Sequence, residues 1–145
     1  MKKAASLPRA HVVFWLALGG AAWLLAMRLA SSEPTPQNAA VTPLLAMGLA
    51  NDQSKELSMI EVDYAAGEST PAHTHHAQAL LYVLEGSIVM QVRGAPSVTL
   101  SAGQTWYEGP DDVHVVSRNA SSSMPAKYVV FLVKDKGAPL LTPVK

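Results

Sequence analysis

The sequence predicts an all-β domain, a small barrel or sandwich, that follows an apolar N-terminal segment. Most of the chain after that segment consists of short apolar runs, rich in β-branched and aromatic residues, separated by Gly, Pro, Asn and Asp. Runs of this length and spacing are typical of strands joined by turns, and no convincing helical period accompanies them. The chain also contains no cysteine. The fold therefore stands without disulfides and needs a real core, which a closed β-barrel provides.

The N-terminal segment is an uncharged run at residues 12–27, preceded by Lys2, Lys3 and Arg9. A run of this length after a basic start fits the apolar part of a secretory signal slightly better than a membrane span, which needs roughly 20 residues. The small residues at 30–32 could serve a signal peptidase. An uncleaved N-terminal anchor helix stays open as the alternative. Both interpretations place the rest of the chain outside the cytoplasm, in the periplasm, either secreted or anchored to the inner membrane.

Residues 33–41 (EPTPQNAAV) have no hydrophobic period and are rich in Pro and Ala, which predicts a linker. We therefore expect an export segment at 1–32, a linker at 33–41 and a β-domain at 42–145. All 11 acidic residues lie from Glu33 onward, whereas four of the 11 basic residues precede it, so the exported part has a net charge of −4. This charge argues against nucleic acid as a partner, and it leaves the N-terminal segment as the only expected contact with a membrane.

The expected strands follow one another through the domain at residues 42–50, 57–64, 79–84, 87–93, 98–100, 105–108, 113–117 and 127–134. Alternation is visible in 57–64, where the even-numbered positions share one face of an extended strand. The run at 127–134 (KYVVFLVK) has the strongest β character, because it is rich in Val and aromatic residues. Residues 137–145 contain two prolines and predict an irregular tail that packs on the barrel.

Four of the five histidines lie in two of these stretches: His73, His75 and His76 in one, and His114 in the other. Side chains at i and i+2 of an extended strand point to the same face. His73 and His75 can therefore aim two imidazoles at one point, and His114 can come from another strand to complete a metal site. His76 would point the opposite way.

These residues resemble the cupin superfamily, and in particular its small single-domain bacterial members. The first motif of the family is Gly, five residues, His-x-His, three or four residues, Glu, six residues and Gly. The second is Gly, five residues, Pro-x-Gly, two residues, His, three residues and Asn. The motif positions that the chain matches are Gly67, His73, His75, Gly86, Gly103 and His114. The resemblance covers residues 57–134 and implies a double-stranded β-helix, or jelly-roll barrel, together with homodimer formation.

The chain departs from the first motif at the metal-binding glutamate. That residue would fall at Ala79, or at Leu80 in the longer spacing, and neither side chain can bind a metal. Gln78 is a candidate ligand, although it would have to point inward against strand alternation. Glu108 could face inward as an acid or base, or supply the missing carboxylate. Tyr82 is a second candidate catalytic residue. The motif proline, glycine and asparagine before and after His114 are also replaced.

A site of three histidines with open positions could hold Zn²⁺ with water, or Fe²⁺, Mn²⁺, Ni²⁺ or Cu²⁺ with a substrate. We expect a metal-dependent reaction on a small oxygenated or anionic molecule. The resemblance makes a dioxygenase the first candidate, and a lyase or isomerase follows. The alternative is a non-catalytic periplasmic protein that binds or senses a metal or small ligand. A barrel that has lost its metal is also left open, because the motif glutamate is missing.

Overall fold

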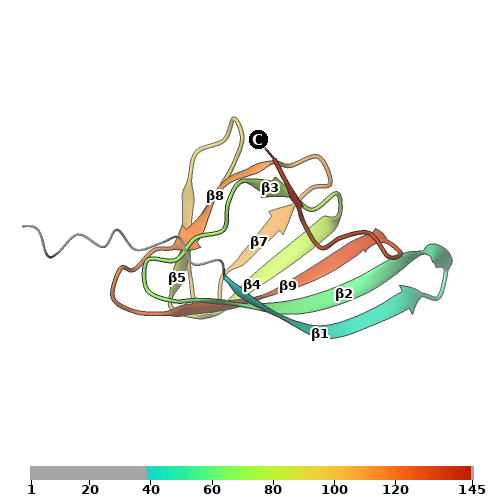
Figure 1. The fold of residues 1–145 in the computed structure, drawn as a ribbon, viewed down its shortest axis with the longest axis horizontal. Coiled ribbons are helices and arrows are strands. Elements are labelled where there is room, and N and C mark those ends of the chain that lie inside the picture. The colour runs from blue at the N-terminus through green and yellow to red at the C-terminus, as the bar shows by residue number, and fades with distance from the viewer. Residues whose placement is uncertain (1–38, 145) are drawn as a thin grey trace, which may run out of the picture. The chain divides into compact units, whose positions relative to one another are not determined.

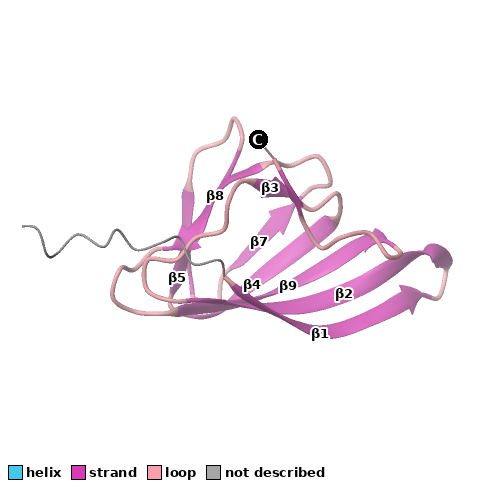
Figure 2. Ribbon diagram, in the orientation of Figure 1, coloured by secondary structure: helices cyan, strands magenta, loops and turns pink. Residues whose placement is uncertain are grey.

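The computed structural model describes residues 39–144, which form two antiparallel β-sheets that face each other (Figure 1). Strands and loops alone make up this part of the chain (Figure 2), so the expected all-β fold is confirmed for these residues. The predicted export segment, residues 1–32, lies outside the described residues, as does most of the predicted linker. Within the described part of the chain, no helix is long and apolar enough to cross a membrane.

Each sheet has five strands. The first sheet, in spatial order, contains β1 (Ala40–Leu49), β2 (Asp52–Tyr64), β9 (Ala126–Asp135), β4 (Gln78–Glu85) and β7 (Thr105–Glu108). The second contains β10 (Thr142–Pro143), β3 (His73–Thr74), β8 (His114–Asn119), β5 (Ser87–Val92) and β6 (Val98–Ser101). Neighbours in space are often distant in sequence, as β2 and β9 show, so the sheets depend on long-range pairing.

The first sheet buries one face because its strands alternate apolar and polar residues. In β2 the even positions from Ser58 to Tyr64 are buried and the odd positions are only partly covered, as the sequence predicts. Ile60 and Val62 of this strand pack with Val130 and Leu132 of β9 in the hydrophobic core. Such burial of aliphatic side chains is the main stabilising contribution in a fold without disulfides.

Strand β4 shows how the alternation aims side chains at the site. Ala79, Leu81 and Val83 are buried, whereas the residues between them are exposed on the outward face. Strand β7 pairs with β4 so that Glu108 lies directly opposite Ala79. Residues opposite each other in an antiparallel pair point to the same face of the sheet. The pairing therefore places a carboxylate on the inner face, beside a residue with a very small side chain.

The C-terminal tail is more regular than the sequence predicted. The tail at 137–145 includes β10, which pairs with β3 through Thr142 opposite Thr74 and Pro143 opposite His73. The turn between β4 and β5 requires glycine: Gly86 has a φ of 68°, and a Cβ there would lie 2.5 Å from the carbonyl oxygen of Pro125. The glycine at the end of the first motif is thus fixed by close packing against a distant loop.

Candidate metal centre

Three histidines from the second sheet meet inside the domain. His73 on β3 lies opposite His114 on β8 in the antiparallel ladder, and His75 follows β3 by one residue. The ring centroid of His73 lies 4.9 Å from that of His75 and 5.1 Å from that of His114. The ring centroids of His75 and His114 are 5.5 Å apart. The structure therefore brings together the three histidines that the sequence singled out, from two separate stretches of chain.

Glu108 reaches the histidines from the first sheet. Its Oε2 atom lies 3.3 Å from Nε2 of His75 and 3.3 Å from Nε2 of His114. His75, Glu108 and His114 offer ligand atoms that all lie within 4.8 Å of one another. Because Glu108 stands opposite Ala79, its carboxylate occupies the neighbourhood that the missing motif glutamate would have filled. Of the two roles expected for Glu108, this position favours supply of the carboxylate.

Several polar atoms of this group are buried without a hydrogen-bond partner among the described residues. They include Oε2 of Glu108 and both ring nitrogens of His114, and both residues are almost completely buried. Unpaired buried polar atoms are rare in native proteins and each costs about 1–3 kcal/mol. A divalent cation here would accept lone pairs from Oε2 of Glu108 and from one ring nitrogen of His114, and would compensate the buried carboxylate. The residues present therefore fit a bound metal ion.

Hydrogen bonds fix the tautomers of the other two histidines. Nδ1 of His73 lies 2.8 Å from the carbonyl oxygen of Pro71, and Nδ1 of His75 lies 2.6 Å from that of Leu140. A carbonyl can only accept, so each Nδ1 carries the proton and each Nε2 keeps its lone pair for a ligand. Burial lowers the pKa of His73, although its bond to Pro71 acts in the other direction, and the neutral ring that a metal requires is favoured.

Not every residue expected at the site reaches it. Gln78 and Tyr82 are exposed on the outward face of β4, the side opposite Ala79 and Leu81, so the structure does not bring them to the histidines. Strand alternation is the physical reason, because inward and outward positions differ by one residue. His76 is exposed and has a φ of 47°, which turns the chain away after His75.

A second polar group, the hydroxyl cluster, forms around Tyr64 and was not expected from the sequence. The Tyr64 hydroxyl is 2.7 Å from Oγ1 of Thr70 and 2.9 Å from Oγ of Ser117, and the Tyr128 hydroxyl donates to it over 3.4 Å. Burial raises the pKa of Tyr128 well above its usual value. Alternation in 57–64 places Tyr64 inside, but no local signal identifies its partners on three other segments.

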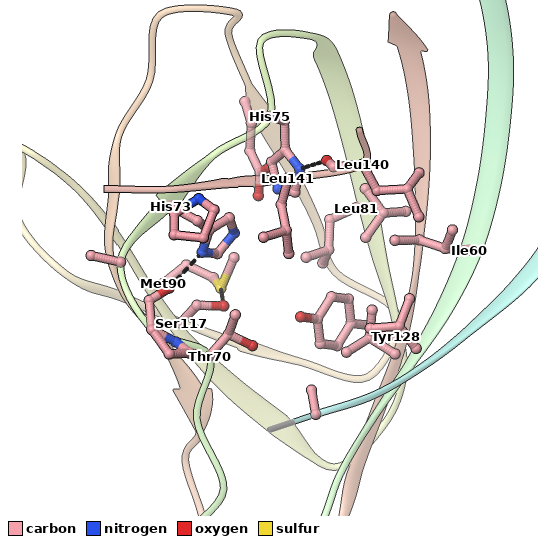
Figure 3. Close-up of a pocket in the computed structure, with 18 residues that line it drawn as sticks. Ile60, Thr70, His73, His75, Leu81, Met90, Ser117, Tyr128, Leu140 and Leu141 are labelled. Atoms are coloured by element: carbon pink, nitrogen blue, oxygen red, sulfur yellow. Dashed lines mark hydrogen bonds and ion pairs between the residues drawn. The ribbon is translucent and has the colours of Figure 1, made fainter. Parts of the chain in front are cut away.

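A cavity of about 550 Å³ connects the two polar groups. Figure 3 shows His73 and His75 near one end of it, and Thr70, Ser117 and Tyr128 toward the other. Most of the remaining lining consists of aliphatic side chains, contributed by both sheets and by the segment that leads into β10. The Leu140 carbonyl that orients His75 belongs to that segment, so the C-terminal tail both covers the cavity and fixes a candidate ligand.

Residues 60–132 match the family described as the Cupin domain. These bounds include both histidine stretches and Glu108. No curated protein matches the chain.

Solved structures with a similar fold include a DMSP lyase and an oxalate oxidase. The DMSP lyase DddQ of Ruegeria pomeroyi has a TM-score of 0.60 and 19% identity, over 74% of this chain and 52% of that one. An uncharacterised protein with a double-stranded β-helix domain from Klebsiella pneumoniae has a TM-score of 0.60 and 18% identity, over 77% and 89%. A recombinant oxalate oxidase in complex with glycolate has a TM-score of 0.59 and 24% identity, over 79% and 59%. The chain thus spans about half the length of the lyase, and the likeness establishes the jelly-roll fold.

Proposed function

The chain belongs to the cupin family, and from that premise we propose that it binds one divalent metal ion through His75, His114 and Glu108, with His73 as a fourth ligand, and acts on a small oxygenated molecule. The observation that carries the proposal is the meeting of the Glu108 carboxylate with Nε2 of two histidines, 3.3 Å from each, in a buried place without other partners. His75, His114 and Glu108 make the donor set of two imidazoles and one carboxylate that many non-haem iron oxygenases use, and His73 would add a third imidazole.

An oxidative reaction is the first candidate, and a lyase or isomerase reaction is the next. When bound, the metal would supply a Lewis acid and, if it is redox-active, a place for oxygen chemistry. The chain contributes two rings whose tautomers are fixed by the carbonyls of Pro71 and Leu140, a buried carboxylate, and a mostly apolar cavity beside them. The lyase and the oxidase of similar fold make both reaction classes reasonable candidates.

A non-catalytic protein that binds or senses a metal or small ligand is the second candidate. The observation that favours it is that Glu108 is the only carboxylate among the described residues lining the cavity. If Glu108 binds the metal, no second carboxylate remains there to transfer a proton, and a binding protein needs none.

The test is elemental analysis of the whole chain, purified without a polyhistidine tag. We expect close to one metal ion per chain in the wild type and none in the double variant His75→Ala/His114→Ala. His76→Ala is the matched control and should keep its metal, because His76 is exposed. Absence of metal from the wild type after incubation with Fe²⁺, Mn²⁺, Zn²⁺, Ni²⁺ and Cu²⁺ in turn would overturn the proposal, and the ion retained would separate redox from Lewis-acid chemistry.

Export belongs to the same proposal. It is supported by the uncharged run at 12–27 after Lys2, Lys3 and Arg9. Fractionation of the whole chain in a Gram-negative host, followed by N-terminal sequencing, tests it. A new N-terminus near residue 33 in the periplasm indicates a cleaved signal, and an intact chain in the membrane indicates an anchor. An intact chain among cytoplasmic proteins would contradict export.

The homodimer implied by the family resemblance stays a prediction. Leu80 and Tyr82 of β4 and Phe131 of β9 are exposed on one outward face of the first sheet, and association would cover apolar surface of this kind. Light scattering on the whole chain tests it, with Leu80→Asp expected to shift the mass toward that of a monomer.

A further inference from the structure

The lining of the cavity differs in character from the candidate metal ligands at its end. Its volume of about 550 Å³ lies in the range of pockets that enclose small organic molecules. Ile60, Leu81 and Val130 line it from the first sheet, and Leu140 and Leu141 line it from the C-terminal segment. An occupant would therefore bury most of its surface against aliphatic side chains.

The cavity lining has few groups that could pair with a charge on the part of the occupant that lies away from the histidines. Among the described residues that line the cavity there is no Lys or Arg, and the single carboxylate is that of Glu108. The hydroxyls of Thr70, Ser117 and Tyr128 already form hydrogen bonds with the Tyr64 hydroxyl in the hydroxyl cluster. A charge away from the histidines would thus be desolvated without a partner of opposite sign, which is costly.

The charge at the ligand end sets a second limit. A divalent ion and the Glu108 carboxylate together leave one positive charge, and the histidines are neutral when they bind a metal. One negative charge on the occupant balances this centre. A second negative charge would lie near Glu108 with no compensating cation in the lining.

We propose that the cavity takes a mostly apolar molecule that carries one oxygen-containing, metal-binding head group with at most one negative charge. The head lies at His73, His75 and Glu108, and the apolar body extends between the sheets against Ile60, Leu81 and Val130. The inference rests on the proposed metal centre, and it narrows the substrate class from small oxygenated or anionic molecules in general. Dicarboxylates and molecules with a charged tail are excluded from productive binding.

A series of straight-chain hydroxamates tests the proposal, because each carries the same monoanionic metal-binding head and differs only in its apolar body. Binding of acetyl, butanoyl, hexanoyl and octanoyl hydroxamate to the metal-loaded whole chain is measured by calorimetry, with the metal content checked afterwards. We expect the affinity to rise about fourfold for each methylene until the cavity is filled. The monohydroxamate of suberic acid has the chain length of octanoyl hydroxamate and ends in a carboxylate, and it should bind at least tenfold more weakly.

Two variants on one strand localise the effect. Val130→Phe fills part of the cavity and should weaken octanoyl hydroxamate while leaving acetyl hydroxamate and the metal content unchanged. Val133→Phe makes the same change on the outward face of β9, where Val133 is 37% exposed, and should alter neither ligand. If Val130→Phe fails to fold, Leu141→Trp serves in its place, because Leu141 is half-buried in the cavity-lining C-terminal segment.

The possible outcomes distinguish a failure of this inference from a failure of the proposed metal centre. Metal-dependent binding with no gain along the series, or equal affinity for the carboxylate-tailed probe, would overturn the apolar substrate class and leave the metal centre standing. Binding that rises with chain length equally in metal-free protein would support the apolar cavity and contradict the proposed role of the metal. Metal-dependent binding that rises along the series and falls only in Val130→Phe supports both.

Discussion

Two polar clusters face one cavity, and they differ in how completely their hydrogen bonds are made. In the hydroxyl cluster, Tyr64 is in contact with hydroxyls of Thr70, Ser117 and Tyr128, and its own hydroxyl also donates to a backbone carbonyl over 3.2 Å. In the histidine cluster, Oε2 of Glu108 and both ring nitrogens of His114 have no hydrogen-bond partner in the described structure. A buried polar group that is complete stabilises a fold, whereas an incomplete one indicates a place for something else to bind.

This difference gives the two clusters opposite roles that mutation can separate. Changes in the hydroxyl cluster should lower stability and leave metal binding intact. Replacement of the Glu108 carboxylate should weaken metal binding without lowering the stability of the metal-free fold, because a buried polar atom without a hydrogen-bond partner contributes no stability.

The largest expected effect is at His75. His75→Ala should abolish metal binding, together with the stabilisation that metal gives, which is about 2.7 kcal/mol at a metal concentration 100-fold above Kd. His76→Ala should retain both, since His76 is exposed and turned away. Thermal unfolding with and without added metal measures the difference, and equal losses in the two variants would contradict the ligand assignment.

Glu108→Gln should have the next largest effect. It keeps the shape of the side chain and removes the charge that would neutralise the metal, so metal affinity should fall on the order of 100-fold, or about 2.7 kcal/mol. The metal-free variant should unfold at the same urea concentration as the metal-free wild type or a higher one, because a buried carboxylate without a partner is replaced by a neutral amide. Glu85→Gln, an exposed position at the end of β4, is the control for both measurements.

Tyr64→Phe addresses the other cluster. Loss of the hydroxyl leaves several groups without a partner, and the free energy of unfolding should fall by about 1–3 kcal/mol. Metal content should stay at the wild-type value. Urea unfolding and elemental analysis on the same preparation check the two halves of the prediction. A folded variant that has lost its metal would show that the clusters are not independent.

The smallest effects are expected on the outward face of β4. Gln78→Ala and Tyr82→Phe should change stability by no more than about 0.5 kcal/mol and leave metal affinity unaltered, because both side chains point away from the cavity. Isothermal titration with the bound metal ion, compared with wild type, is the measurement. A tenfold loss of affinity in Gln78→Ala would restore the ligand role that its position argues against.

The sequence by itself determined where most of the strands lie and which histidines could form a metal site. Periods of two residues and the turn residues between runs are local, so they predicted most of β1, β2, β4 to β9 and the buried face of β2. The i, i+2 spacing of His73 and His75 is also local, and the structure brings both rings to His114. The short strands β3 and β10 carry too few residues to show any period.

Only the tertiary structure decided how the site is completed. The position of Glu108 depends on the register of β7 against β4, which sets it opposite Ala79, and the orientation of His75 depends on a carbonyl 65 residues away. The partners of Tyr64 likewise come from other segments. Register and long-range contacts depend on how whole sheets pack and close, and a local pattern of apolar and polar residues does not contain that information.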